Sequence, residues 1–342
     1  MRKSNIEILR LLSMLLIVLS HWGGHGSYNI GEGYVFNEAY ILFTNYLGEV
    51  GNCVFLLITG YFGVNRENVN WKGVKRVVVD VKFYAFLIWM LFILLRTYPI
   101  TAKGVIGALL PIVYPQYWFV LPFLLVIILA PFINNIISNS NKKQITSFFI
   151  VLAAIELIMP VIHSKSVCSN LGLFILYYSV GALIGKNESI YRKLLTNRWW
   201  LSLSSLVVYL VILCLLLFKT KTGIDIVPSN SMAWRFSPIP LMCAIGLFMV
   251  FSLYDITSKN INSIAKSAFA VYLISENPNM YPNLWKLPFF DSGEYGSSFM
   301  MIPFSFLITF LVLCACVFID QIIKKLFVFI ATLNPLTKKY NG

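Results

Sequence analysis

Charge is scarce in this chain. Only 12% of its 342 residues are charged and 58% are hydrophobic, whereas an average soluble domain has about 25% charged residues. The mean hydropathy is +0.76. These values exclude an ordinary soluble domain and indicate a polytopic membrane protein. No long polar stretch separates the apolar runs, so we expect one membrane domain, residues 1–342, without a soluble domain.

Acidic residues are fewer than basic residues in this chain. The chain has 14 Asp and Glu against 27 Lys and Arg, which gives a net charge of +13. In a soluble protein this excess would suggest nucleic-acid binding. In a membrane protein, Lys and Arg mark cytoplasmic loops and contact anionic headgroups. We therefore expect the lipid bilayer, and no nucleic acid, as the partner of these residues.

The chain has few residues that bind metals or form disulfides. None of its six cysteines belongs to a CxxC pair, and it has only three histidines. His21 and His25 have the spacing of a helical metal pair. However, Gly23 and Gly24 are expected to break the helix between them, and His163 is a poor third ligand. We therefore expect no metal site.

Long apolar runs are abundant. A spanning helix needs about 20 apolar residues, and the runs predict an all-α fold with about ten transmembrane helices. The ninth is short enough to be partly re-entrant. A short surface helix is expected over 102–113, and 319–334 is expected to extend the last helix along the membrane interface. The ten predicted spans are 6–22, 40–63, 74–95, 117–137, 144–163, 170–185, 199–218, 237–254, 261–275 and 298–318.

The lysines and arginines predict the orientation of these spans. With the N-terminus inside, 18 of the 27 fall in inner segments and seven in outer segments, while Arg10 and Lys82 lie within spans. This bias favours a multi-pass protein of the plasma membrane with both termini in the cytoplasm. No A-x-A cleavage site follows the first apolar run, so we expect a retained anchor and not a cleaved signal peptide.

The first predicted span carries two ionisable residues, Arg10 and His21. Eleven positions along an α-helix turn through about 1100° and rise about 16 Å, so the two side chains share one face. With the predicted orientation, Arg10 lies toward the cytoplasm and His21 toward the outer side. Ionisable residues within a span are costly and mark functional sites by default. Arg10 has a structural alternative as the partner of Glu7, one turn back.

Four motifs in this order resemble those of the membrane acyltransferase family 3, over nearly the whole chain. The family's opening signature is an acidic residue, Leu-Arg, ten residues and His. Its other elements are a Phe-rich end of the second span, a Trp-Phe opening of the fourth and a Tyr-Leu-Ile helix in the ninth. The matching residues here are Glu7 to Arg10 with His21, Phe55 to Phe62, Tyr117 to Phe119 with Ala130-Pro131, and Ala270 to Ile274.

This resemblance implies transfer of an acyl group, usually acetyl, from cytoplasmic acyl-CoA to a hydroxyl of an exported or lipid-linked cell-surface polysaccharide. A sugar hydroxyl needs a base, and histidine suits that role. We expect His21 to act as general base or as a transient acyl carrier. Arg10 is expected to contact the donor's pantetheine or phosphate end. The CoA phosphates are expected to bind an inner basic cluster, Arg66, Lys72, Lys75 and Arg76, although a positive-inside loop would look the same.

Further site residues are expected at the outer end. Glu276 either orients His21 or accepts a hydrogen bond from the sugar, unless it only marks a helix terminus. Tyr117 and Trp118 either line the acceptor cavity or anchor a helix. The full set of predicted acceptor-binding residues is Tyr117, Trp118, Tyr272 and Asn277.

The chain departs from the family pattern at two places. Ser275 stands where the family often has a histidine, and no strict Arg-x-Arg follows the second span. Glu49 and Glu156 lie within predicted spans, where each either pairs with a base or lines a polar cavity.

Other functions remain open at this point. A transporter or flippase of lipid-linked glycan would show internal repeats or paired broken helices, and the sequence suggests neither. A glycan polymerase would have a large outer loop, whereas the outer loops expected here are short. A scaffold without chemistry would have no reason to bear the cost of a buried ionisable stripe.

Overall fold

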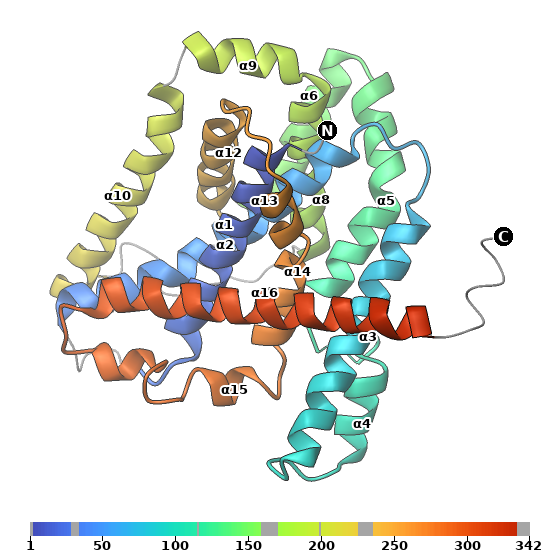
Figure 1. Cartoon of the computed structure of the whole chain (residues 1–342). Helices are drawn as coiled ribbons and strands as arrows, with labels where there is room; N and C mark the ends of the chain where they lie inside the picture. The colour runs from blue at the N-terminus through green and yellow to red at the C-terminus, as the bar shows by residue number, and fades with distance from the viewer. Residues whose placement is uncertain are drawn as a thin grey trace.

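The computed structural model describes residues 3–28, 34–114, 116–158, 170–197, 200–224 and 235–333. Every regular element in these ranges is a helix (Figure 1). The longer helices are α1 (Ser4–His25), α2 (Val35–Gly63), α3 (Trp71–Leu94), α5 (Val120–Asn139), α6 (Lys142–Ala153), α8 (Asn170–Lys186), α9 (Glu188–Asn197), α10 (Trp200–Thr222), α12 (Pro238–Ser252) and α16 (Met301–Leu333). The short ones are α4 (Ala102–Leu109), a π-helix at Ala154–Ile158, α13 (Lys259–Ala265), α14 (Ala268–Ser275), α15 (Tyr281–Leu284) and a 3-10 turn at Ser292–Tyr295.

The all-α prediction is confirmed for the described residues, and helices lie on all ten predicted spans. Local signals set several helix starts: Asn70 caps α3 by accepting from the Gly73 N–H, and Asn141 with Gln144 forms a capping box at α6. Within the described ranges, five helices are long and apolar enough to cross a membrane, namely α1, α2, α3, α5 and residues Met301–Phe327 of α16. The number of about ten crossings therefore stays a prediction. The surface helix expected over 102–113 is present as α4.

The last two predicted spans differ from a simple bundle. Segment 261–275 is broken after Lys266 into α13 and α14, so it does not form one continuous crossing. Segment 298–318 and the expected interfacial extension 319–334 belong to a single helix, α16, without a break. In Figure 1, α16 lies across α1 and α14 and does not run alongside them, and it packs on both.

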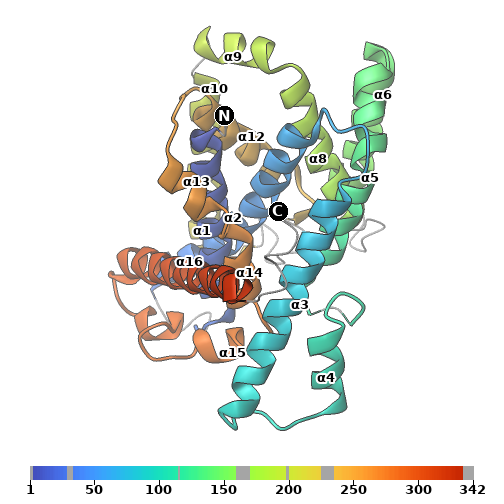
Figure 2. The same cartoon turned by 45° about the vertical axis from the view of Figure 1, so that its right-hand side comes forward.

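Helices α1 and α2 form the centre of the molecule. Their contact is close because glycines face the partner backbone: a Cβ on Gly51 would lie 2.5 Å from the Ser13 carbonyl oxygen. On its other side α2 packs against α8, with α3 and α5 beyond (Figure 2). This arrangement places the face of α1 that carries Arg10 and His21 toward the inside of the protein.

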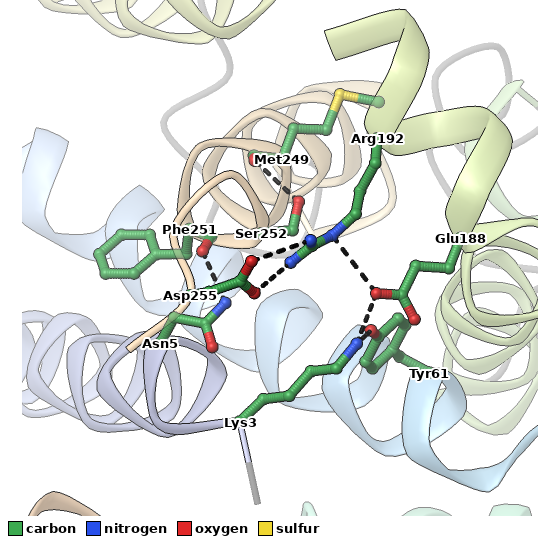
Figure 3. A network of polar contacts seen from close by, with 9 residues as sticks. All are labelled: Lys3, Asn5, Tyr61, Glu188, Arg192, Met249, Phe251, Ser252 and Asp255. Carbon is green, nitrogen blue, oxygen red and sulfur yellow. Dashed lines mark hydrogen bonds and ion pairs between the residues drawn. The ribbon is translucent and has the colours of Figure 1, made fainter. Parts of the chain in front are cut away.

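A polar network ties the α1 end that carries Lys3 to α2, α9 and the segment after α12 (Figure 3). Lys3 Nζ donates to the Tyr61 hydroxyl at 2.6 Å and forms an ion pair with Glu188. Arg192 binds both carboxylate oxygens of Asp255 and reaches Glu188 at 3.4 Å. The network lies at the end of the molecule where the connections predicted to be cytoplasmic gather (Figure 1).

Candidate active site

Helix α1 continues through Gly23 and Gly24 to His25. The expected break at these glycines is wrong, and the reason is packing: a Cβ on Gly23 would lie 2.2 Å from Thr44 Oγ1 of α2. The glycines therefore allow α2 to approach and do not end the helix. His21 and His25 consequently lie one helical turn apart on the same face.

His21 and Glu276, the two residues predicted to be catalytic, meet in the structure. His21 Nδ1 lies 2.8 Å from Glu276 Oε1, and His25 Nε2 lies 3.4 Å from Glu276 Oε2. The His21 contact has ion-pair distance without the angles of a hydrogen bond. The imidazole rings are 5.5 Å apart, and His25 stacks on Tyr281 at 4.5 Å. Glu276 therefore bridges two imidazoles.

Glu276 is held in place by the end of α14. It is the C-cap residue of that helix, and its backbone N–H donates to the Tyr272 carbonyl. Burial opposes ionisation of the carboxyl, but His21 and His25 outweigh it and lower the pKa of Glu276 to about 2. The side chain is consequently a carboxylate at physiological pH, and it can stabilise a positive charge on either imidazole.

The same three groups satisfy the distance requirement of a metal site. One ligand atom from each of His21, His25 and Glu276 lies within 4.8 Å of the others. Because α1 does not break at Gly23 and Gly24, the two histidines form the helical pair that was not expected. The donor set suits a transition metal such as zinc, so a metal role for these groups competes with a base role for His21.

Three of the four predicted acceptor-binding residues, Tyr117, Tyr272 and Asn277, lie at the end of α14, but two of them use their polar atoms within the protein. The Tyr117 hydroxyl donates to the Leu273 carbonyl, and the Asn277 amide donates to that hydroxyl, both at 2.9 Å. Tyr117 and Asn277 are 3% and 1% exposed. Their geometry suits support of the α14 end, next to Glu276.

Trp118 belongs to a different contact from the other predicted acceptor residues. Its ring lies 4.0 Å from the guanidinium carbon of Arg235, a cation–π pair. Arg235 also holds Glu49 through two nitrogens at 2.8 and 2.9 Å. Glu49 therefore has the basic partner that was one of its two predicted roles, whereas Glu156 is buried beside Gly172.

A narrow cavity lies along the α1 stripe between Arg10 and His21. It is lined from α1 by Met14 and Ile17, which are four and seven positions after Arg10 and share its face. Its volume is about 10 Å³, near the threshold for a single water molecule. The other lining residues come from α2, from α14 and from the start of α5: Asn52, Phe55, Phe119, Phe269 and Tyr272.

The residues predicted to bind the donor lie in three different settings. Arg10 pairs with the buried Glu7 at 2.8 Å, which realises its structural alternative and leaves a donor role as a prediction. Arg66 lines a larger pocket, of about 610 Å³, between the α2–α3 connection and α5. The lining is rich in amide side chains. Lys72, Lys75 and Arg76 are exposed on the first turns of α3.

His25 lies in this cluster but is not among the site residues predicted from the sequence. Its spacing of four from His21 is a visible signal in the sequence, but it was outweighed by the expected helix break. It supplies a second imidazole to the site, although Ser275 replaces the histidine that the family pattern often has.

One comparison with known proteins gives a match. A family model described as "Acyltransferase domain" matches residues 3–321. No curated protein and no solved structure matches the chain. The matched range includes His21, His25 and Glu276.

Proposed function

Because the chain belongs to membrane acyltransferase family 3, we propose that it transfers an acyl group, acetyl being the expected one, from cytoplasmic acyl-CoA to a hydroxyl of an exported or lipid-linked polysaccharide. The observation that carries the proposal is the contact between His21 and Glu276, 2.8 Å apart at one end of the α1 stripe. A base oriented by a carboxylate is what a weak hydroxyl nucleophile requires.

The proposed chemistry uses His21 as the base. With Nδ1 toward Glu276, the Nε2 atom takes the proton of the acceptor hydroxyl as its oxygen attacks the thioester carbonyl. The tetrahedral intermediate collapses by breaking the C–S bond, and the CoA thiolate recovers the proton from His21. The Glu276 carboxylate stabilises the imidazolium between these steps. In the variant route, His21 Nε2 attacks the thioester carbonyl and CoA leaves as its thiolate. The acceptor hydroxyl then attacks the acyl-imidazole, His21 leaves as the free imidazole, and the hydroxyl proton passes to the thiolate.

The donor is proposed to bind from the end opposite His21. The amide-rich pocket beside Arg66 has a volume of about 610 Å³, within the range of small-molecule sites. Its arginine and amides suit the phosphates and the base of the CoA nucleotide. Lys72, Lys75 and Arg76 on α3 add positive charge near this end. A donor role for Arg10 would require its guanidinium to bind the donor in addition to Glu7.

The test compares surface glycan from cells carrying the natural protein and the His21→Ala variant. We expect the ester to disappear from the glycan by mass spectrometry and NMR, while protein level and glycan amount stay unchanged. His163→Ala is the matched control, because this histidine is the one to which no role is assigned. Near-normal acylation in the His21→Ala cells would refute the base role.

The same experiment separates the rival functions. A transporter or polymerase would lose glycan itself, or change its chain length, in the variant cells. Chelation addresses the metal alternative: with His21 as a metal-free base, washing membranes with EDTA leaves acyl transfer unchanged. Loss of transfer, and its recovery with zinc, would assign the three groups to a metal instead.

A further inference from the structure

The narrow cavity beside α1 lies where a donor arm would have to pass. Arg10, Met14, Ile17 and His21 follow one another at helical spacing on a single face of α1. The two polar residues stand at the ends of this stripe, and the two apolar ones line the cavity. The rise from Arg10 to His21 is about 16 Å, which is comparable to the length of a pantetheine arm.

The walls of the cavity are mainly aromatic. Phe119 is the central ring, with centroids 5.9 Å from Phe55 and 5.8 Å from Tyr272. Phe269 lies 6.3 Å from Tyr272 and 6.1 Å from Phe123. Rings packed in this way keep a fixed cross-section, because interiors at this density tolerate little change in volume.

The remaining lining is polar or adaptable. Asn52 of α2 is 8% exposed and provides an amide, which matches the amide groups of a pantetheine arm. Met14 is unbranched and has several rotatable bonds, so it can change rotamer to widen the cavity. The Tyr272 backbone carbonyl receives the N–H of Glu276, so the wall is joined directly to the catalytic end.

We propose that this cavity is the passage for the acyl-pantetheine arm, and that Phe119, Phe269 and Tyr272 set the length of the acyl chain that reaches His21. This inference rests on the proposed function. The acyl group is the leading end of the arm and must pass the three rings before the thioester meets the acceptor. The arm follows the acyl group past the same rings, so the length limit applies where the thioester stops at His21. There a longer acyl chain lies back against the three rings, and each added methylene meets a wall that has no space for it.

The first test measures donor preference in membranes that contain the protein and its natural acceptor. Labelled acetyl-, butyryl- and hexanoyl-CoA are supplied, and base-labile label is counted in the glycan. We expect the natural protein to prefer acetyl over butyryl by about tenfold or more, the usual effect of extra methylenes in a packed site. Phe269→Ala should bring this ratio toward one, and Met14→Phe should stop transfer from all three donors.

Phe92→Ala is the matched control, because Phe92 is a buried phenylalanine of α3 that does not line the cavity. It should lower activity at most in proportion to protein level and keep the natural donor preference. A natural preference in Phe269→Ala membranes that actively transfer acetyl would overturn the passage, whereas it would leave the proposed function intact.

A second test requires no acceptor and no turnover. Met14→Cys is placed in a chain whose six cysteines are replaced by serine, and its alkylation by N-ethylmaleimide is timed with and without CoA. We expect CoA to slow the reaction several-fold at Met14→Cys and not at Val113→Cys, an exposed position. Equal rates with and without CoA would show that the arm does not occupy the cavity. If no donor supports transfer in the natural membranes, the proposed function fails and this test still decides the passage.

Discussion

At the scale of single residues, Glu276 explains why two histidines can share one site. A carboxylate between two imidazoles favours a positive charge on each of them, yet only one imidazole is needed as a base. His21 is on the stripe with Arg10 and next to the aromatic cavity, whereas His25 is further along α1 and stacks on Tyr281. This difference in position supports the proposed proton transfer by His21, with His25 holding Glu276.

Removal of the Glu276 charge should show whether this residue positions His21 or only supports the fold. We expect Glu276→Gln to lower acyl transfer by about 100-fold, the lower range for loss of acid–base assistance. Glu276→Asp keeps the charge and should recover most of the rate, and both variants should keep the natural protein level. A Gln variant that transfers acyl groups at the natural rate would reduce Glu276 to a structural role.

The depressed pKa of Glu276 also makes a prediction about stability. Its folded pKa, about 2, lies below its ordinary value of 4.5. The ionised carboxylate therefore stabilises the fold fully above pH 4.5, and this stabilisation is lost as pH falls toward 2. Thermal midpoints of the purified protein and the Gln variant should differ most above pH 5 and converge in acid. A constant difference down to pH 2 would contradict the assigned ion pairs.

At the scale of helices, α1 was the most predictable element and also the source of an error. Its periodic apolar run and its Arg10–His21 spacing are local properties, so the helix and the face shared by these two residues follow from the sequence. The continuation through Gly23 and Gly24 depends on Thr44 of α2, a tertiary contact that no local pattern reveals. The break after Lys266 and the crosswise course of α16 are tertiary in the same sense.

The close approach of α1 and α2 should be sensitive to small additions. Gly51→Val places a branched side chain against the Ser13 carbonyl and Ile17, and overpacking of this kind costs about 1–3 kcal/mol. We expect a lower thermal midpoint together with reduced acyl transfer, since Ile17 lines the cavity. Ala102→Val on the exposed helix α4 is the control and should change neither. An unaltered midpoint for Gly51→Val would mean that the two helices are less tightly packed.

At the scale of the whole molecule, the sequence predicts which segments are apolar and which loops lie on the same side of the membrane. The helices fall on all ten predicted segments, and the connections rich in Lys and Arg gather at one end (Figure 1). The partners across the fold could not be predicted. Arg235 and Glu49 are 186 positions apart and His21 and Glu276 are 255 apart, and only the packing of α2, α12 and α14 around α1 joins them.

The two ends of the molecule should face different compartments. We expect Asn68→Cys, in the connection between α2 and α3, to react with an impermeant maleimide only in inverted membrane vesicles. Lys286→Cys, beyond α15, should react only in intact cells or right-side-out vesicles. Both variants are compared in a chain without its natural cysteines. Reaction of both from the same side would rule out the predicted orientation.

Helix α1 is fixed at both of its ends, by the network around Lys3 (Figure 3) and by the contact of His21 and His25 with Glu276. When a helix moves along its axis by one residue, in the manner of a screw, its side chains turn by about 100°. Rotation of α1 about its own axis would therefore have to break charged contacts at both ends at once. The stripe cannot be turned away from the cavity by a change at one end alone, so any helix movement that admits a donor must come from the helices around α1.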